Sequence, residues 1–107
     1  MFNVKLGKSG GLFNAKKIIA LAEKAKMHMQ VGAFMESRLG ITAAAHLALC
    51  SDYIIHCDFD TPLMFTEDPV SGGIIYGKNG KVTVPDSSGL GATIDIARLN
   101  KMTRVSI

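Results

Sequence analysis

The residues best suited to chemistry are a lysine near the start of the chain and two aspartates near its middle. Lys5 lies in the segment 2–6, whose composition is typical of a short strand. Asp58 and Asp60 are two residues apart, so an extended backbone would place both carboxylates on one side. A lysine shielded from water can act as a general base, and paired carboxylates can bind a metal or a substrate ammonium group. These residue types allow proton transfer beside a bound cation.

Each of these residues also has a purely structural interpretation. Lys5 could reach water from a strand end while its methylene groups cover apolar surface. Asp58 and Asp60 could belong to a solvated loop that is stabilised by Asx turns. As metal ligands they lack further oxygen donors nearby in the sequence. Residue types alone therefore leave both interpretations open.

The elements that would position these side chains alternate between strand and helix. Three segments are predicted strands, namely residues 2–6, 29–34 and 53–57. Apolar residues at helical spacing predict an amphipathic helix that begins at Leu12. A second, more apolar helix is predicted over residues 39–50, with Ser37 as its N-cap. This alternation indicates parallel strands joined by right-handed crossovers.

Polar side chains occur where each predicted strand ends. Lys5 lies at the end of the first strand, Glu36 and Ser37 follow the second, and Asp58 and Asp60 follow the third. In α/β barrels and open α/β sheets, the carboxyl ends of the strands carry the active site. We therefore expect Lys5, Glu36, Asp58 and Asp60 to contribute to one site.

Beyond residue 60 the chain becomes rich in Pro, Gly, Ser and Asp. Segments 74–76 and 81–84 flank an Asn-Gly pair, which predicts a β-hairpin. A short helix is predicted over residues 95–101, with Asp95 near its start. The three parallel strands would have open edges and one uncovered face, which is typical of a part of a larger α/β fold.

The composition excludes several classes of protein. Hydrophobic residues make up 48% of the 107, which is enough to form a core. The net charge of +3 is too small to require a nucleic acid partner. No apolar stretch reaches the roughly 18–20 residues that a membrane span needs. Cys50 and Cys57 form neither a disulfide framework nor a zinc motif. We expect a cytoplasmic protein that binds neither nucleic acid nor membrane.

Three segments resemble the muconate-lactonizing subgroup of the enolase superfamily. NVKLGKSGG (residues 3–11) resembles its sixth-strand motif, and VGAFMESRLGITAAAH (31–46) resembles its seventh-strand region. CDFDTP (57–62) is similar to the eighth-strand D-x-D of dipeptide epimerases of the Ala-Glu type. The resemblance implies an α/β fold: the C-terminal three strand–helix units of a modified TIM-type (β/α) barrel. Residues 1–61 would form this partial barrel, and 62–107 a return segment with a hairpin and a short helix.

The resemblance also implies an activity. Such epimerases move the proton α to a carboxylate, with two lysines on opposite faces of the substrate and a Mg²⁺ ion that stabilises the enediolate. By position, Lys5 resembles the sixth-strand lysine, Asp58 and Asp60 the carboxylates that hold the dipeptide ammonium, and Glu36 and Ser37 the wall that contacts substrate. The second lysine, the Mg²⁺ ligands and the capping domain would lie outside these 107 residues. We therefore expect a C-terminal fragment that is inactive alone and self-associates or needs the missing barrel half and capping domain.

Two alternatives remain open at this point. The chain could be part of a muconate cycloisomerase or an o-succinylbenzoate synthase. Substrates of those enzymes carry no α-ammonium group, so Asp58 and Asp60 would have no evident use. The chain could instead be a non-catalytic α/β interaction module, either alone or as a half that complements a partner chain.

Overall fold

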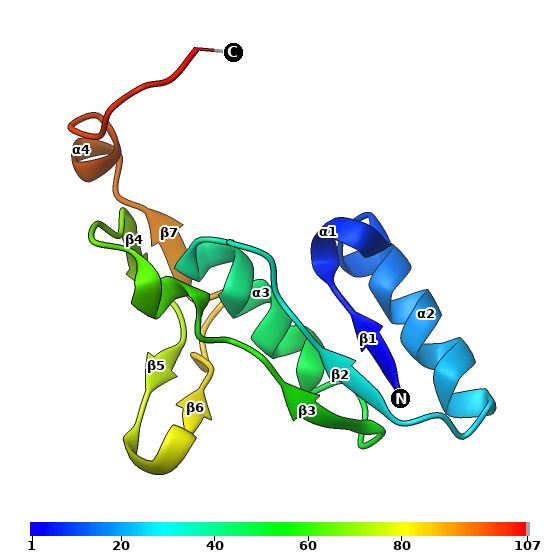
Figure 1. Ribbon diagram of the computed structural model, residues 1–107. Coiled ribbons are helices and arrows are strands. Elements are labelled where there is room, and N and C mark those ends of the chain that lie inside the picture. The colour runs from blue at the N-terminus through cyan, green and yellow to red at the C-terminus, as the bar shows by residue number, and fades with distance from the viewer. Residues whose placement is uncertain (107) are drawn as a thin grey trace.

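The computed structural model describes residues 1–106, and its first half contains a three-stranded parallel sheet (Figure 1). The strands are β1 (Phe2–Val4), β2 (Met29–Val31) and β3 (Ile54–Cys57), paired in the order β1-β2-β3. Val4 pairs with Val31, and Val31 pairs with Cys57, so the three strands end at the same level. The predicted parallel arrangement is confirmed.

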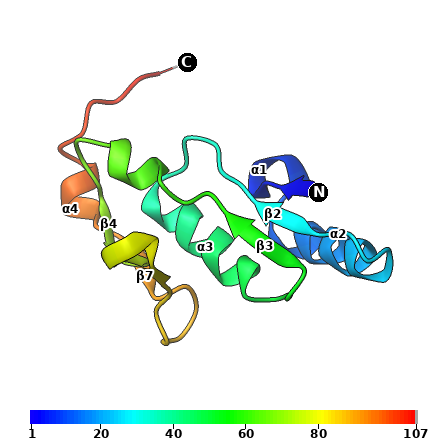
Figure 2. The same cartoon turned by 60° about the horizontal axis from the view of Figure 1, so that its bottom comes forward.

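Helices α2 (Leu12–Lys24) and α3 (Arg38–Ala48) pack against this sheet. One core cluster joins them to it, because Ile19 of α2 and Leu47 of α3 are buried together with Val4 and Met29. Figures 1 and 2 show α2 along β1 and α3 along β2 and β3. In α2 the buried residues Ala15, Ile19 and Ala22 follow the predicted helical spacing, whereas Leu12 at the start of the helix is exposed.

Some predicted boundaries differ from the structure, and the second strand, for example, ends at Val31 rather than at residue 34. The first strand ends at Val4 rather than at residue 6, because Leu6 begins a short helix, α1 (Leu6–Ser9). Lys5 has an extended backbone and forms the junction between β1 and α1. Ser37 does precede α3, as predicted for an N-cap, but its side chain makes no capping hydrogen bond.

The second half consists of short elements, and β3 is followed by a 3-10 turn, η1 (Thr61–Met64), rather than by a long helix. Six further elements complete it: β4 (Val70–Gly72), β5 (Ile75–Tyr76), η2 (Lys78–Gly80), β6 (Val82–Thr83), β7 (Ala92–Ile94) and α4 (Ile96–Leu99). The predicted hairpin is β5–β6, and Asn79 and Gly80 both have positive φ at its turn. Asp95 caps α4 by accepting a hydrogen bond from the Arg98 backbone N–H at 3.1 Å.

A second small sheet was not predicted. Strand β4 (Val70–Gly72) pairs antiparallel with β7, and both lie next to α3 (Figure 1). A second core cluster holds the hairpin against the first half, with Ile74 buried between Ala33, Ile41 and Ala45. No helix within residues 1–106 combines the length and hydrophobicity that crossing a lipid bilayer requires.

Candidate functional site

The register of the sheet places Lys5 and Asp58 at one level of its carboxyl edge. Each residue directly follows an aligned strand end, Val4 or Cys57, and Gly32 occupies the same level of the middle strand. The Gly32 N–H donates to the Val4 carbonyl and the Asp58 N–H donates to the Val31 carbonyl, both at 2.9 Å. Because Gly32 has no side chain, the Asn3 side chain can lie over it, and a Cβ at Gly32 would be only 2.5 Å from the Asn3 Oδ1.

The Lys5 side chain extends over the end of the middle strand. Its Nζ donates a hydrogen bond to the Ala33 carbonyl oxygen at 2.6 Å and lies 4.9 Å from the centre of the Phe34 ring. Lys8 Nζ lies 5.9 Å from the same ring. Lys5 is half-buried, so its ammonium group is held by a carbonyl and an aromatic face rather than by water alone.

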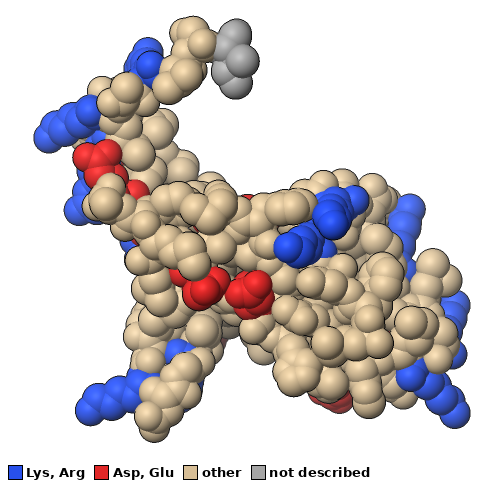
Figure 3. Space-filling model, in the orientation of Figure 1, with Lys and Arg blue, Asp and Glu red and all other residues tan. Residues whose placement is uncertain are grey.

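Asp58 and Asp60 are both exposed at the end of β3. Partial desolvation raises the pKa of Asp58, and so do a hydrogen bond to the Asp60 side chain and the negative charge of Asp60, whereas the positive charge of Lys5 lowers it. The two carboxylates therefore interact with each other, and Asp58 lies within electrostatic reach of Lys5. Figure 3 shows acidic and basic side chains exposed on one face of the molecule.

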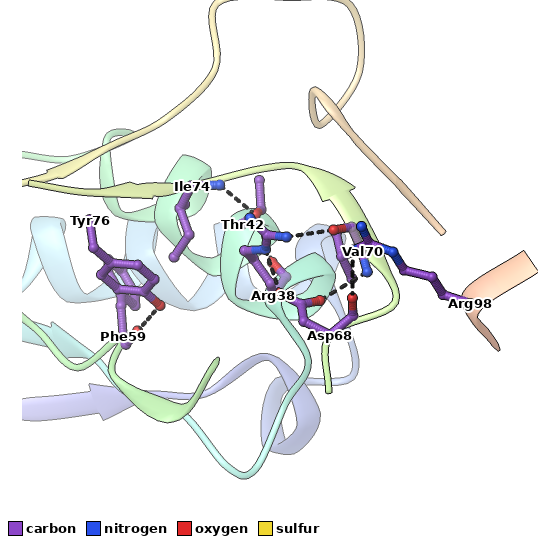
Figure 4. Close-up of polar contacts among 8 residues, drawn as sticks. All are labelled: Arg38, Thr42, Phe59, Asp68, Val70, Ile74, Tyr76 and Arg98. Atoms are coloured by element: carbon purple, nitrogen blue, oxygen red, sulfur yellow. Dashed lines mark hydrogen bonds and ion pairs between the residues drawn. The ribbon is translucent and has the colours of Figure 1, made fainter. Parts of the chain in front are cut away.

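Hydrogen bonds to backbone carbonyl groups fix the loop that carries the two aspartates. The Leu63 N–H donates to the Asp60 carbonyl at 2.9 Å, and the Thr61 hydroxyl donates to the Glu36 carbonyl at 3.3 Å. The Tyr76 hydroxyl donates to the Phe59 carbonyl, as Figure 4 shows. These bonds hold the loop in one conformation, which is what a preformed binding site requires.

Glu36 and Ser37 lie between β2 and α3, as predicted. Glu36 is half-buried, and its Oε2 is buried without a hydrogen-bond partner among the described residues. A Cβ at Gly40 would lie 3.1 Å from the Glu36 Cβ, so the glycine makes room for this side chain. Ser37 is exposed, and within residues 1–106 its side chain makes no hydrogen bond.

The structure thus places all five predicted residues at the carboxyl ends of the strands. It brings Lys5 near Asp58, and Asp58 near Asp60, while Glu36 is joined to this group only through its backbone. Sequence analysis did not single out Phe34, whose ring faces Lys5. The available signal was an aromatic residue at the end of a predicted strand.

The described residues do not fit a Mg²⁺ site of their own. Within residues 1–106, no three His, Cys, Asp or Glu side chains gather so that they could hold a metal ion. Asp58 and Asp60 interact with each other and could offer a metal ion carboxylate oxygens. A metal ion needs more oxygen ligands than this pair, and the positive charge of Lys5 already acts on Asp58.

This chain has a parallel sheet covered by helices, with a lysine and an acidic pair at the carboxyl ends of its strands. This arrangement is typical of α/β proteins that carry their active site at the strand ends. Residues 1–98 match the family model described as enolase C-terminal domain-like, and the chain belongs to this family. The resemblance seen in the sequence is thereby confirmed.

Curated relatives and solved structures narrow the likeness further. The chain is 55% identical over 106 residues to the D-Ala-D/L-Ala epimerase of Cytophaga hutchinsonii, covering 99% of this chain and 29% of the relative. It is 44% identical to the L-Ala-D/L-Glu epimerase of Bacillus subtilis over 85% of this chain and 25% of the relative. A crystal structure of the dipeptide epimerase from Cytophaga hutchinsonii, complexed with Mg and the dipeptide D-Ala-L-Val, superposes with a TM-score of 0.84. Its sequence identity is 60%, over 87% of this chain and 25% of that one. The chain therefore spans little more than a quarter of the length of these relatives.

Proposed function

We propose that this chain is the last part of a Mg²⁺-dependent dipeptide epimerase that works in the cytoplasm. The observation that carries the proposal is the position of Lys5 and the Asp58–Asp60 pair at one level of the carboxyl edge. Dipeptide epimerases among the relatives support the substrate class. The Mg²⁺ ligands would lie outside this chain, since the described residues do not fit a metal site.

Lys5 would move the proton at the carbon next to the substrate carboxylate. As a neutral amine its Nζ would take this proton and become an ammonium group, while an acid outside this chain protonates the opposite face. In the reverse direction Lys5 would return the proton. The position of Lys5 directly after β1, at the carboxyl edge of the parallel sheet, supports this role, because such edges carry the active site in α/β folds.

Asp58 and Asp60 would bind the free α-ammonium group of the dipeptide. Two carboxylates on one preformed loop provide charge-assisted hydrogen bonds to an ammonium group. Glu36 and Ser37 would line the wall beside the substrate, and the unpartnered Glu36 Oε2 supports a contact there. A muconate cycloisomerase or an o-succinylbenzoate synthase is less well supported, because its substrate would leave the aspartate pair unused.

Residues 1–61 would form the end of a barrel and residues 62–107 the return segment. By itself, this part would lack the second base and the metal ligands, so the chain alone would show no epimerase activity. Because part of the barrel would be missing, the chain would either associate with itself or assemble with the remaining barrel and the capping domain.

The test is a restored enzyme, in which residues 1–107 replace the matching last part of the Cytophaga hutchinsonii epimerase. It should epimerise Ala-Ala dipeptides with added Mg²⁺, and an N-acetylated dipeptide, which lacks the ammonium group, should be a poor substrate. Asp58→Asn should raise the KM of the free dipeptide by about a hundredfold. Equal turnover of the free and acetylated dipeptides, or an unchanged KM in Asp58→Asn, would contradict the assignment.

A further inference from the structure

We infer that Tyr76 is a positioning residue for the aspartate pair: its hydroxyl holds the carbonyl of Phe59, the residue between Asp58 and Asp60. The inference rests on the proposed function, in which the pair binds the substrate ammonium group. Tyr76 touches neither substrate nor base in this account. It acts through the backbone that joins the two carboxylates.

The contact crosses from the return segment to the site. Tyr76 lies on β5 and is half-buried, and its ring packs with Phe59 against the core cluster around Ile74. Figure 4 shows the ring extending to Phe59 with the hydroxyl directed at the carbonyl oxygen. A single side chain thus provides both packing beneath the loop and a hydrogen bond to its centre.

The aspartate loop has one anchor on each side of this contact. The Asp58 N–H bonds to the Val31 carbonyl of β2, and the Asp60 carbonyl accepts from the Leu63 N–H. Between these two bonds, the Tyr76 hydroxyl is the hydrogen-bond partner that the described residues give to the Phe59 carbonyl. Without it, the peptide groups between the two carboxylates can rotate, and the spacing of the carboxylates changes.

Tyr76 also lies close enough to the pair to respond to its charge. Burial raises the pKa of Tyr76, and the negative charges of Asp60 and Asp68 raise it further. The positive charge of Arg38 lowers this pKa, but the net shift is upward. The phenol is therefore protonated and able to donate at neutral pH.

The hairpin that carries Tyr76 is itself fixed to α3. The Ile74 N–H donates to the buried Thr42 hydroxyl at 3.0 Å, and that hydroxyl donates to the Arg38 carbonyl at 2.6 Å (Figure 4). Arg38 forms an ion pair with Asp68, with Nε 2.7 Å from Oδ2. Tyr76 is thus held by a rigid support rather than by a free loop, as a positioning residue must be.

The experiment uses the restored enzyme with Tyr76→Phe, which removes the hydroxyl and keeps the ring. The KM for a free dipeptide should rise about tenfold, while kcat stays within about threefold. Tyr53→Phe is the matched control. Tyr53 is the other tyrosine of the chain and is also half-buried, but within residues 1–106 its hydroxyl makes no hydrogen bond. This control should leave KM unchanged.

A double variant separates positioning from a general loss of structure. If Tyr76 acts through the pair, Tyr76→Phe should add little to the KM effect once Asp58→Asn is present. Additive effects, or an unchanged KM in Tyr76→Phe while Asp58→Asn raises it, would overturn the inference and leave the proposed function intact. An unchanged KM in Asp58→Asn would instead remove the proposed function itself.

A second variant covers the case in which Tyr76→Phe does not fold. 3-Fluorotyrosine at position 76 keeps the ring and the hydroxyl, and fluorine makes the phenol more acidic. The KM calculated for the dipeptide with a protonated amino group should then begin to rise at a lower pH than in the enzyme with tyrosine, because a phenolate cannot donate. Superimposable KM profiles would overturn the inference.

Discussion

The ammonium nitrogen of Lys5 donates a hydrogen bond to the carbonyl oxygen of Ala33 at 2.6 Å. This bond joins the residue after β1 to the segment after β2, and Asp58 at the end of β3 lies within reach of the same positive charge. Three consecutive parallel strands therefore contribute to one edge of the sheet. The site depends on their register, because a shift by one residue would turn the Lys5 side chain to the other face of the sheet.

The titration of Asp58 should be linked to its two charged neighbours. Its pKa is raised by partial burial and by Asp60 and lowered by Lys5, so Asp60→Asn should lower this pKa and Lys5→Met should raise it. Carbon-13 NMR of the aspartate carboxyl groups measures both shifts. Equal midpoints in all three proteins would show that the groups do not interact.

The same pKa determines how binding depends on pH. Only the ionised carboxylate attracts an ammonium group, so dipeptide affinity should fall as the pH drops through the pKa of Asp58. Because that pKa is raised, the fall should begin at a higher pH than for an ordinary aspartate. The sign for stability is opposite: the raised pKa contributes stability below the ordinary aspartate range, and this is lost as the pH rises through the folded-state value.

The contact between Gly73 and Thr42 should make Gly73→Ala destabilising. Gly73 has a φ of +86°, and a Cβ there would lie 2.6 Å from the Thr42 Oγ1, which accepts the Ile74 hydrogen bond. Gly89 has a φ of +65° and no atom within 4 Å of such a Cβ, so Gly89→Ala carries the backbone strain alone. Urea unfolding should show Gly73→Ala losing about 1–3 kcal/mol more than this control. Equal losses would mean that the close contact has no energetic effect.

The isolated 107-residue chain should associate with itself. Strands β1 and β3 form the two edges of the sheet, with Phe2 42% exposed and Ile55 48% exposed. Unpaired strand edges with apolar side chains favour pairing between chains. Sedimentation velocity should therefore show species larger than a monomer. Addition of a polypeptide that supplies the upstream strands should replace them by a defined complex, and a stable monomer without that polypeptide would contradict this expectation.

Much of the first half could be predicted from the sequence because its elements have clear periodicity. The apolar stripe of α2 and the nearly continuous apolar run of α3 each determine a buried face. The end of β1 was placed too late because Leu6, an apolar residue suited to either state, begins a helical turn instead. Such boundaries depend on tertiary packing, which a single sequence does not reveal.

The site could be predicted in part for a similar reason. Lys5 and Asp58 follow strand ends, and the parallel order alone brings such residues to one edge. Tyr76 could not be predicted, because its contact with Phe59 joins residues 17 apart across an irregular segment. The β4–β7 pair was missed because its strands lie in the part of the chain that is rich in Pro, Gly and Ser, a composition that predicts loops, and β4 itself contains Ser71 and Gly72.

The central claim is that Lys5 exchanges the α-proton on one face of the dipeptide, and deuterium incorporation tests it most directly. In the restored enzyme in D₂O with Mg²⁺, both stereoisomers of a dipeptide should gain deuterium at the reacting carbon. In Lys5→Met, epimerisation should fall by about a thousandfold or more, and one stereoisomer should stop exchanging while the other continues through the base on the opposite face. Continued exchange of both stereoisomers in Lys5→Met would contradict the account.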